Sequence, residues 1–231
     1  MPRQSSQRLQ RLEFHGNMAV DFDTIGFLVL AALLAVVALI VNSVPLLVGA
    51  MILTPLFDHI LAVPFGLANR DWQLAWQGAW RSLVLWVIAF GACLLAAWVF
   101  LDTPLAPHRL TEPDNPLLAE RLQVDWSSVV VGLVAGAGGA LASASNRQMN
   151  LLGVVVALAL VPALAAGAIA FISGRWNGWA GLGLFGVNVL GIVVAGLLVL
   201  LFRRAAGRAE DGLERQVQRA GPPPKRKKRG K

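Results

Sequence analysis

The sequence of 231 residues contains no tyrosine, a single cysteine and few charges, with Asp, Glu, Lys and Arg making up 14% of the chain. The lone cysteine, Cys93, excludes a disulfide or a multi-cysteine metal cluster formed within this sequence. Because soluble domains carry about 25% charged residues, the shortage of charge argues against an ordinary soluble fold. The sequence has no HExxH, Gly-x-Ser-x-Gly or phosphate-loop motif, so we expect no enzyme, no metal site and no cofactor.

Apolar residues are abundant instead, at 56% of the chain, and the mean hydropathy is +0.63. A helix needs about 20 mainly apolar residues to cross the hydrocarbon core of a bilayer. Six stretches meet this requirement: 24–42, 44–67, 80–101, 126–145, 151–172 and 179–202. The sequence therefore predicts an all-α polytopic membrane protein with six transmembrane helices.

The positions of the basic residues predict how the chain is oriented. With both termini in the cytoplasm, seventeen of the twenty Lys and Arg residues fall on the cytoplasmic side, as the positive-inside rule requires. We therefore expect a multi-pass protein of the cell membrane with cytoplasmic N- and C-termini. Its parts are a short cytoplasmic segment (1–23), a transmembrane domain (24–202) with an extracytoplasmic loop (102–125), and a basic, largely disordered cytoplasmic tail (203–231).

The tail ends in PPPKRKKRGK, which holds six basic residues within ten. Near a cytoplasmic membrane face, each such charge is attracted to anionic lipid by about 1 kcal/mol. In a soluble protein the same run would suggest nuclear import or nucleic-acid binding. Here we expect the partners to be the lipid bilayer and its anionic lipids, and we expect no nucleic-acid partner.

Six spans divide into two sets of three, and an odd number in each half places the second half upside down in the membrane. VGAMILTP (48–55) aligns without gaps with VVALALVP (155–162), and each segment ends in a proline inside the middle span of its half. The sequence thus predicts a 3+3 inverted repeat with second and fifth helices broken at Pro55 and Pro162. The alternative is that both prolines only kink their helices for packing.

A proline within a helix removes the donor to the carbonyl group four residues earlier. Met51 and Leu158 would therefore have free carbonyl oxygens near the middle of the bilayer. Lipid offers no donor, so we expect these oxygens to face hydroxyl groups, water or a ligand.

Polar residues near the two prolines form the candidate transport site. Asp58 and His59 follow Pro55 by about one helical turn, and ionisable residues within spans are candidates for function. The alternative is that the second span ends near Leu61 and that this pair lies at the cytoplasmic interface. The complete set of candidate transport-site residues is Asn42, Thr54, Pro55, Asp58, His59, Asn146 and Pro162.

The fourth span reads GLVAGAGGALASAS and is rich in small residues. Gly132 and Gly136 lie four positions apart, and Gly139 follows them. Faces of this kind let two helices approach backbone to backbone, so we expect helix packing here. A narrow pore lined by this face is the alternative.

Two stretches of the sequence resemble a known family. NSVPLLVGAMILTPLFDHI, followed by NRDW, and the later GLVAGAGGALASASNRQMNLLGVVVALALVPALAAGAIA are similar to the two blocks of the bacterial and archaeal membrane family called domain of unknown function 389. The resemblance implies an integral membrane protein, often described as transporter-like, without an agreed substrate. Many members carry a soluble domain before the first span, where this sequence has about twenty residues. The family also tends to have a second proline where this sequence has Asp58 and His59.

Two functions are compatible with these features. The first is a small-solute or ion transporter or channel with its site between the broken middle helices of the two halves, in which Asp58 carries a proton. The second is a membrane scaffold or stress-response component that assembles through its small-residue helices. Inverted repeats often accompany dimers, so a homo-oligomer is an open prediction.

Overall fold

The computed structural model describes residues 21–54, 57–101, 115–145, 150–174 and 177–220. Within these ranges the chain forms eight α-helices and no strand, which confirms the all-helical prediction. The helices are α2 (Phe22–Ile40), α3 (Val44–Ile52), α4 (Phe57–Ala68), α5 (Trp72–Leu101), α6 (Pro116–Arg121), α7 (Trp126–Ser145), α8 (Asn150–Ser173) and α9 (Gly178–Ala220).

Most helix boundaries agree with the expected spans, and two differ. α2, α7 and α8 begin and end within two residues of the predicted stretches. α5 begins at Trp72 rather than near residue 80, because Asp71 accepts a hydrogen bond from the Leu74 amide and caps an earlier turn. α9 continues to Ala220, so the segment 203–220 is helical where we expected a disordered tail.

The two middle spans behave differently at their prolines. The second span consists of two helices, because α3 ends at Ile52 and α4 begins at Phe57. Pro55 itself lies outside the described residues. α8 continues through Pro162 without interruption, so the predicted break in the fifth helix is wrong. A helix can retain an internal proline when neighbouring helices hold it in place, as Pro64 inside α4 also shows.

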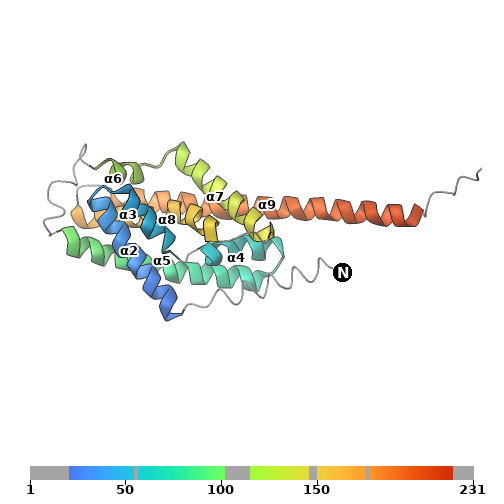
Figure 1. Ribbon diagram of the computed structural model, residues 1–231, viewed down its shortest axis with the longest axis horizontal. Coiled ribbons are helices and arrows are strands. Elements are labelled where there is room, and N and C mark those ends of the chain that lie inside the picture. Colours follow the sequence, from blue (N-terminus) through green and yellow to red (C-terminus); the bar gives the residue numbers. More distant parts are fainter. Residues whose placement is uncertain (1–20, 55–56, 102–114, 146–149, 175–176, 221–231) are drawn as a thin grey trace, which may run out of the picture.

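Figure 1 shows how the helices are arranged. α5 and α9 run along the long axis, α2 crosses them obliquely, and the end of α9 projects beyond the other helices. α9 packs most extensively against α7 and then against α8. These contacts place the last long helix against both other helices of the second half.

The interior contains two apolar clusters. One joins α2, α3, α5 and α8 through residues such as Leu39, Met51, Leu85 and Val161. The other joins α4, α7, α8 and α9 through residues such as Ile60, Ala135, Leu160 and Ile192. α8 is common to both clusters, so it lies between α3 on one side and α4 on the other.

The outer face of the bundle is also apolar. Three helices, Phe22–Ile40, Trp72–Leu101 and Gly178–Ala206, are long and apolar enough to cross a membrane, with mean hydropathies of 2.6, 2.5 and 2.7. Large apolar side chains on each point outward, such as Leu30, Val87 and Leu190, which are 55%, 64% and 67% exposed. Exposed apolar surface of this extent is typical of contact with lipid and indicates a membrane protein.

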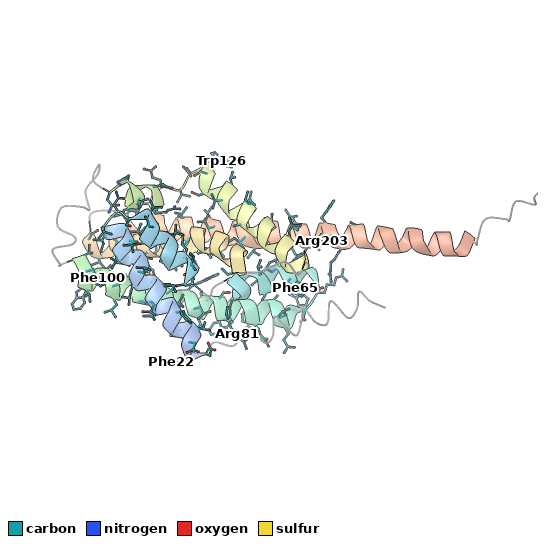
Figure 2. The ribbon with its side chains drawn as sticks, viewed as in Figure 1. Phe22, Phe65, Arg81, Phe100, Trp126 and Arg203 are labelled. Carbon is teal, nitrogen blue, oxygen red and sulfur yellow. The ribbon has the colours of Figure 1, made fainter. Side chains whose placement is uncertain are left out.

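The two ends of the bundle are held by different polar contacts. At one end, Asn115 Nδ2 donates to the carbonyl oxygen of Leu39 at 2.6 Å and joins the start of α6 to the end of α2. At the other end, the guanidinium group of Arg204 in α9 donates to Asn69 Oδ1 in the turn between α4 and α5. Figure 2 shows these opposite ends, with Phe100 at the first and Phe65 and Arg203 near the second.

Candidate functional site

The interruption between α3 and α4 is closed on its α3 side by Thr54. The Thr54 hydroxyl donates to the carbonyl oxygen of Ala50 at 3.0 Å, and its amide donates to that of Met51 at 3.3 Å. The Met51 carbonyl therefore has a donor, and the prediction of a free oxygen there is wrong. A threonine side chain replaces one helical hydrogen bond, which lets α3 end inside the protein, since Thr54 is only 7% exposed.

The α4 side of the interruption is buried as well. His59 lies in the first turn of α4 and is 2% exposed. α4 continues to Ala68, so the helix itself does not end near Leu61, where the alternative placed the end of the span. An imidazole group is thus placed inside the bundle, several turns from the end of its helix.

α5 crosses α4 at very short range beside this imidazole-bearing turn. A methyl group added at Gly78 would lie 2.8 Å from Ala62 Cβ and 3.1 Å from the carbonyl oxygen of His59. A methyl group at Gly66 would meet the backbone of Ala75 at 2.5 Å. Residues later in α4 thus lie beside residues earlier in α5, so the two helices are antiparallel.

This register places Ser82 at the level of the interruption. Ser82 lies four residues, or about one turn, beyond Gly78 and on the same face of α5. It is 1% exposed, and its hydroxyl has no hydrogen-bond partner among the described residues. A further turn along, the buried Nε1 of Trp86 also lacks a partner in the described part of the chain, while its ring packs edge-on against Phe185 of α9 at 5.1 Å.

α9 brings a buried amide to the same level. A methyl group at Gly196 would lie 3.2 Å from Pro64 Cγ, and Ile192 shares a cluster with Ile60. α4 and α9 are therefore parallel in this region, and one turn before Ile192 is Asn188, which is 3% exposed. Thr54, His59, Ser82 and Asn188 make up four of the five buried polar residues that the structure describes. We call these four the polar layer.

The predicted site residues divide into three groups. Thr54, His59 and Pro162 border the interruption. Pro162 does so because the two residues before it pack against both sides of the interruption: Val161 in the apolar cluster of Met51, and Leu160 in that of Ile60. Pro55 and Asn146 lie outside the described residues, and so does the side chain of Asp58, although its backbone is in α4.

Asn42 does not belong to the polar layer. It has a φ of 55° in the turn between α2 and α3, and its Oδ1 accepts from the Leu117 amide at 3.3 Å. Asparagine tolerates the left-handed region better than most residues, and its side chain here ties the turn to α6. Asn42 therefore holds one end of the bundle, about the length of α3 away from Thr54.

Ser82 and Trp86 were missed by the sequence analysis. The sequence feature that could have pointed to them is a hydroxyl and an indole four residues apart inside an apolar run. Only the contact at Gly78 shows that they face α4. Within the residues described, no group of three His, Cys, Asp or Glu side chains is placed to hold a metal ion.

The glycine-rich span packs tightly against α9. A methyl group at Gly132 would lie 3.2 Å from the Cα of Asn188, and one at Gly136 would overlap the carbonyl oxygen of Ile192. Both close approaches run in the same chain direction, so α7 and α9 are parallel. Gly139 is also buried. This contact fixes the helix that carries Asn188.

Comparison with known proteins identifies one family. The family described as Domain of unknown function (DUF389) matches residues 51–194, which is more than half of the chain. A protein of Methanocaldococcus jannaschii, described as uncharacterized, is 26% identical over 204 residues, covering 85% of this chain and 60% of the relative. The chain thus spans less than two thirds of that relative's length. No solved structure matches the chain.

Proposed function

This chain belongs to the DUF389 family of unknown function, and from its geometry we propose that it crosses the cell membrane six times and carries a small solute or ion through the polar layer. The proposal includes cytoplasmic termini and an arrangement of two inverted halves. Three long apolar helices support the location in a membrane. The proposed topology places most Lys and Arg residues on the cytoplasmic side, as the positive-inside rule requires.

One observation carries the proposal: a helix is interrupted inside the bundle, and buried polar side chains from its two halves, α3 and α4, and from α5 lie at the level of the interruption. Thr54 ends α3, His59 is in the first turn of α4, and Ser82 comes from α5. The Ser82 hydroxyl has no partner among the described residues, and a buried polar group is costly in an apolar interior unless it is paired. Discontinuous helices lined by such groups are the usual form of a transport site in secondary carriers.

The polar layer offers the chemistry that a partly dehydrated solute requires. The hydroxyl groups and the Asn188 amide can each donate and accept hydrogen bonds, and an imidazole can do both in its neutral form. The indole N–H of Trp86 adds a donor. Asp58, whose backbone is in the same turn as His59, provides the carboxyl group that we propose to carry a proton.

Flux measurements with the full chain in proteoliposomes test this function. Proton, sodium, potassium and chloride gradients are imposed in turn and followed with ion-sensitive dyes. We expect flux for at least one gradient. Ser82→Ala should reduce this flux about tenfold, because it removes a hydrogen bond to the solute worth about 1 kcal/mol or more. Ser173→Ala should not change the flux. Ser173 is the matched control because its hydroxyl donates to Ala170 near the end of α8.

A second variant separates proton coupling from binding. Asp58→Asn keeps the size of the side chain and removes its charge, so we expect it to abolish pH-driven flux while the protein still folds. Unchanged flux in this variant would remove Asp58 from the mechanism.

The scaffold function remains the second candidate, and the length of α9 favours it. α9 has 43 residues, about twice what a bilayer requires, and its end projects beyond the bundle (Figure 1). In that case no gradient would drive flux. Deleting the basic segment from Gly221, proposed to contact anionic lipid, would then abolish a cellular phenotype that Asp58→Asn leaves intact.

A further inference from the structure

A cavity of about 560 Å³ lies at the end of the bundle where α4 turns into α5 and α9 leaves the other helices. Its lining consists of Ala68, Asn69, Arg70, Leu201, Arg204 and Ala205. Two arginines therefore face a space bounded by small and apolar residues. This cavity is separate from the polar layer and is not used by the proposed transport.

Asn69 holds one of these arginines in position. Its Nδ2 donates to the carbonyl oxygen of Phe65 at 2.7 Å, which leaves Oδ1 to accept from the Arg204 guanidinium. A guanidinium group has five N–H donors in a fixed planar fork, so this hydrogen bond orients the whole group at the wall of the cavity. The wall of the cavity is thus preorganised.

Arg70 occupies a backbone position that suits glycine. Its φ is 55°, in the left-handed region, where a residue with a side chain is less stable than glycine. Arg70 lies two residues after Ala68, at the left-handed position that closes the end of α4, where glycine is the commonest residue. An arginine here places a second guanidinium at the mouth of the cavity, at some cost to the backbone.

The tryptophans beside the cavity indicate that it lies at the depth of lipid headgroups. Trp72, Trp76 and Trp80 are 72%, 71% and 57% exposed, and their spacing of four residues puts them on one face of α5. Indole rings prefer the interface between headgroups and acyl chains. Because Trp72 is only two residues from Arg70, the arginines lie beside this interface.

The charge around the cavity is positive. Arg203 lies next to Arg204 on α9, near the same end as Phe65 (Figure 2). Asp71 is the acidic residue of the turn, and its carboxylate accepts from the Leu74 amide as the cap of α5. Among the described side chains of this turn and of α9 beside it, one carboxylate stands against three arginines, which leaves an excess of positive charge.

We propose that this cavity binds the phosphodiester headgroup of an anionic phospholipid, with Arg70 and Arg204 donating to the phosphate oxygens. Guanidinium groups match phosphate geometry with paired N–H donors. The acyl chains would then lie along the exposed tryptophan face of α5. The inference requires that the protein is embedded in a membrane, and it does not depend on transport. It also differs from the general attraction of lipid to the basic tail, because it assigns a defined pocket.

Native mass spectrometry of the full chain in detergent tests the site. Phosphatidylglycerol and phosphatidylcholine are titrated separately, and inorganic phosphate is added as a competitor. We expect phosphatidylglycerol to bind more tightly than phosphatidylcholine, and Arg204→Ala to weaken its binding about tenfold through the loss of a charge-assisted hydrogen bond. Arg203→Ala is the matched control, since Arg203 is adjacent but does not line the cavity, and we expect it to change binding little.

Arg70→Gly keeps the test valid if Arg204→Ala does not fold. This change removes a guanidinium and relieves the left-handed backbone, so we expect equal or higher thermal stability together with weaker phosphatidylglycerol binding. Equal losses in Arg203→Ala and Arg204→Ala would mean general electrostatic attraction and would overturn the site. Displacement of the lipid by millimolar phosphate would assign the cavity to a soluble anion instead, and equal binding of phosphatidylcholine would also contradict the proposal.

Discussion

The Cβ position of Gly78 lies 3.1 Å from the carbonyl oxygen of His59, so α5 touches the backbone of α4 in its first turn. No side chain separates the helices here, and the same position is 2.8 Å from Ala62 Cβ. This contact sets the register that brings Ser82 to the interruption between α3 and α4. The polar layer therefore depends on a glycine that has no side chain.

We predict that Gly78→Ala destabilises the protein by about 1–3 kcal/mol, because two closely packed helices must move apart. The measurement is the free energy of unfolding in mixed detergent micelles. Gly91→Ala is the control on the same helix, since nothing lies within 4 Å of its Cβ position. Alanine is the better helix former, so Gly91→Ala should be neutral or stabilising by up to about 1 kcal/mol. Equal effects of the two changes would contradict the close contact.

The contact between α7 and α9 gives a second steric prediction. Gly136→Ala places a methyl group against the carbonyl oxygen of Ile192, so we expect a loss of about 1–3 kcal/mol of unfolding free energy. Gly186→Ala on α9 meets open space and should cost nothing. If Gly136→Ala unfolds at the same denaturant concentration as Gly186→Ala, the two helices do not approach as closely as described.

Asn115 gives a prediction for the opposite end of the bundle. It is fully buried, donates to the Leu39 carbonyl and accepts from the Leu118 amide at 3.0 Å. Asn115→Ala removes the acceptor of the Leu118 amide and one of the donors to the Leu39 carbonyl oxygen, which keeps its hydrogen bond from the Asn42 amide. We expect a loss of about 1–3 kcal/mol in thermal or chemical unfolding. The exposed Gln123→Ala is the control. A neutral result for Asn115→Ala would show that water satisfies these groups equally well.

The helices were predictable because the apolar sequence implies that lipid surrounds them. In lipid, backbone groups must pair within their own segment, so apolar stretches of about 20 residues fold as helices whatever their contacts. An interruption of the second span was predictable from the sequence, because a proline such as Pro55 has no amide hydrogen to donate. Pro162 has the same chemistry and does not break α8, because packing around a proline decides between a break and a tolerated kink.

The composition of the site was predictable only in part. Thr54 and His59 could be named because polar residues are rare in these spans. Ser82 could not, since its importance depends on the register between α4 and α5, which is set by backbone contacts at Gly66 and Gly78. Asn42 was assigned to the site from its sequence neighbours, and its left-handed turn conformation places it elsewhere.

Asp125 provides a test of pH dependence outside the spans. The hydroxyl of Ser127 and the amide and hydroxyl of Ser128 donate to its carboxylate and hold its pKa below the ordinary value of 3.8. A carboxylate whose pKa is lowered by folding stabilises the protein at pH values above its ordinary pKa. This stabilisation is lost as the pH falls through the lowered pKa of the folded protein.

We therefore expect the melting temperature of the wild-type protein to fall more steeply than that of Asp125→Asn as the pH decreases below about 4. The two proteins should differ most at neutral pH, where the carboxylate caps α7. Parallel melting curves across this range would contradict the assigned hydrogen bonds.

If the polar layer is a transport site, water must enter it during the working cycle. Thiol labelling tests this access most directly. Thr54→Cys and Ser82→Cys, each combined with Cys93→Ala, are reconstituted in vesicles and treated with a membrane-impermeant maleimide. The wild-type protein is the reference, since its single thiol, Cys93, is fully buried in the apolar part of α5. We predict that both introduced thiols react faster than Cys93. If neither does, the interior is closed to water and the protein is not a carrier of this design.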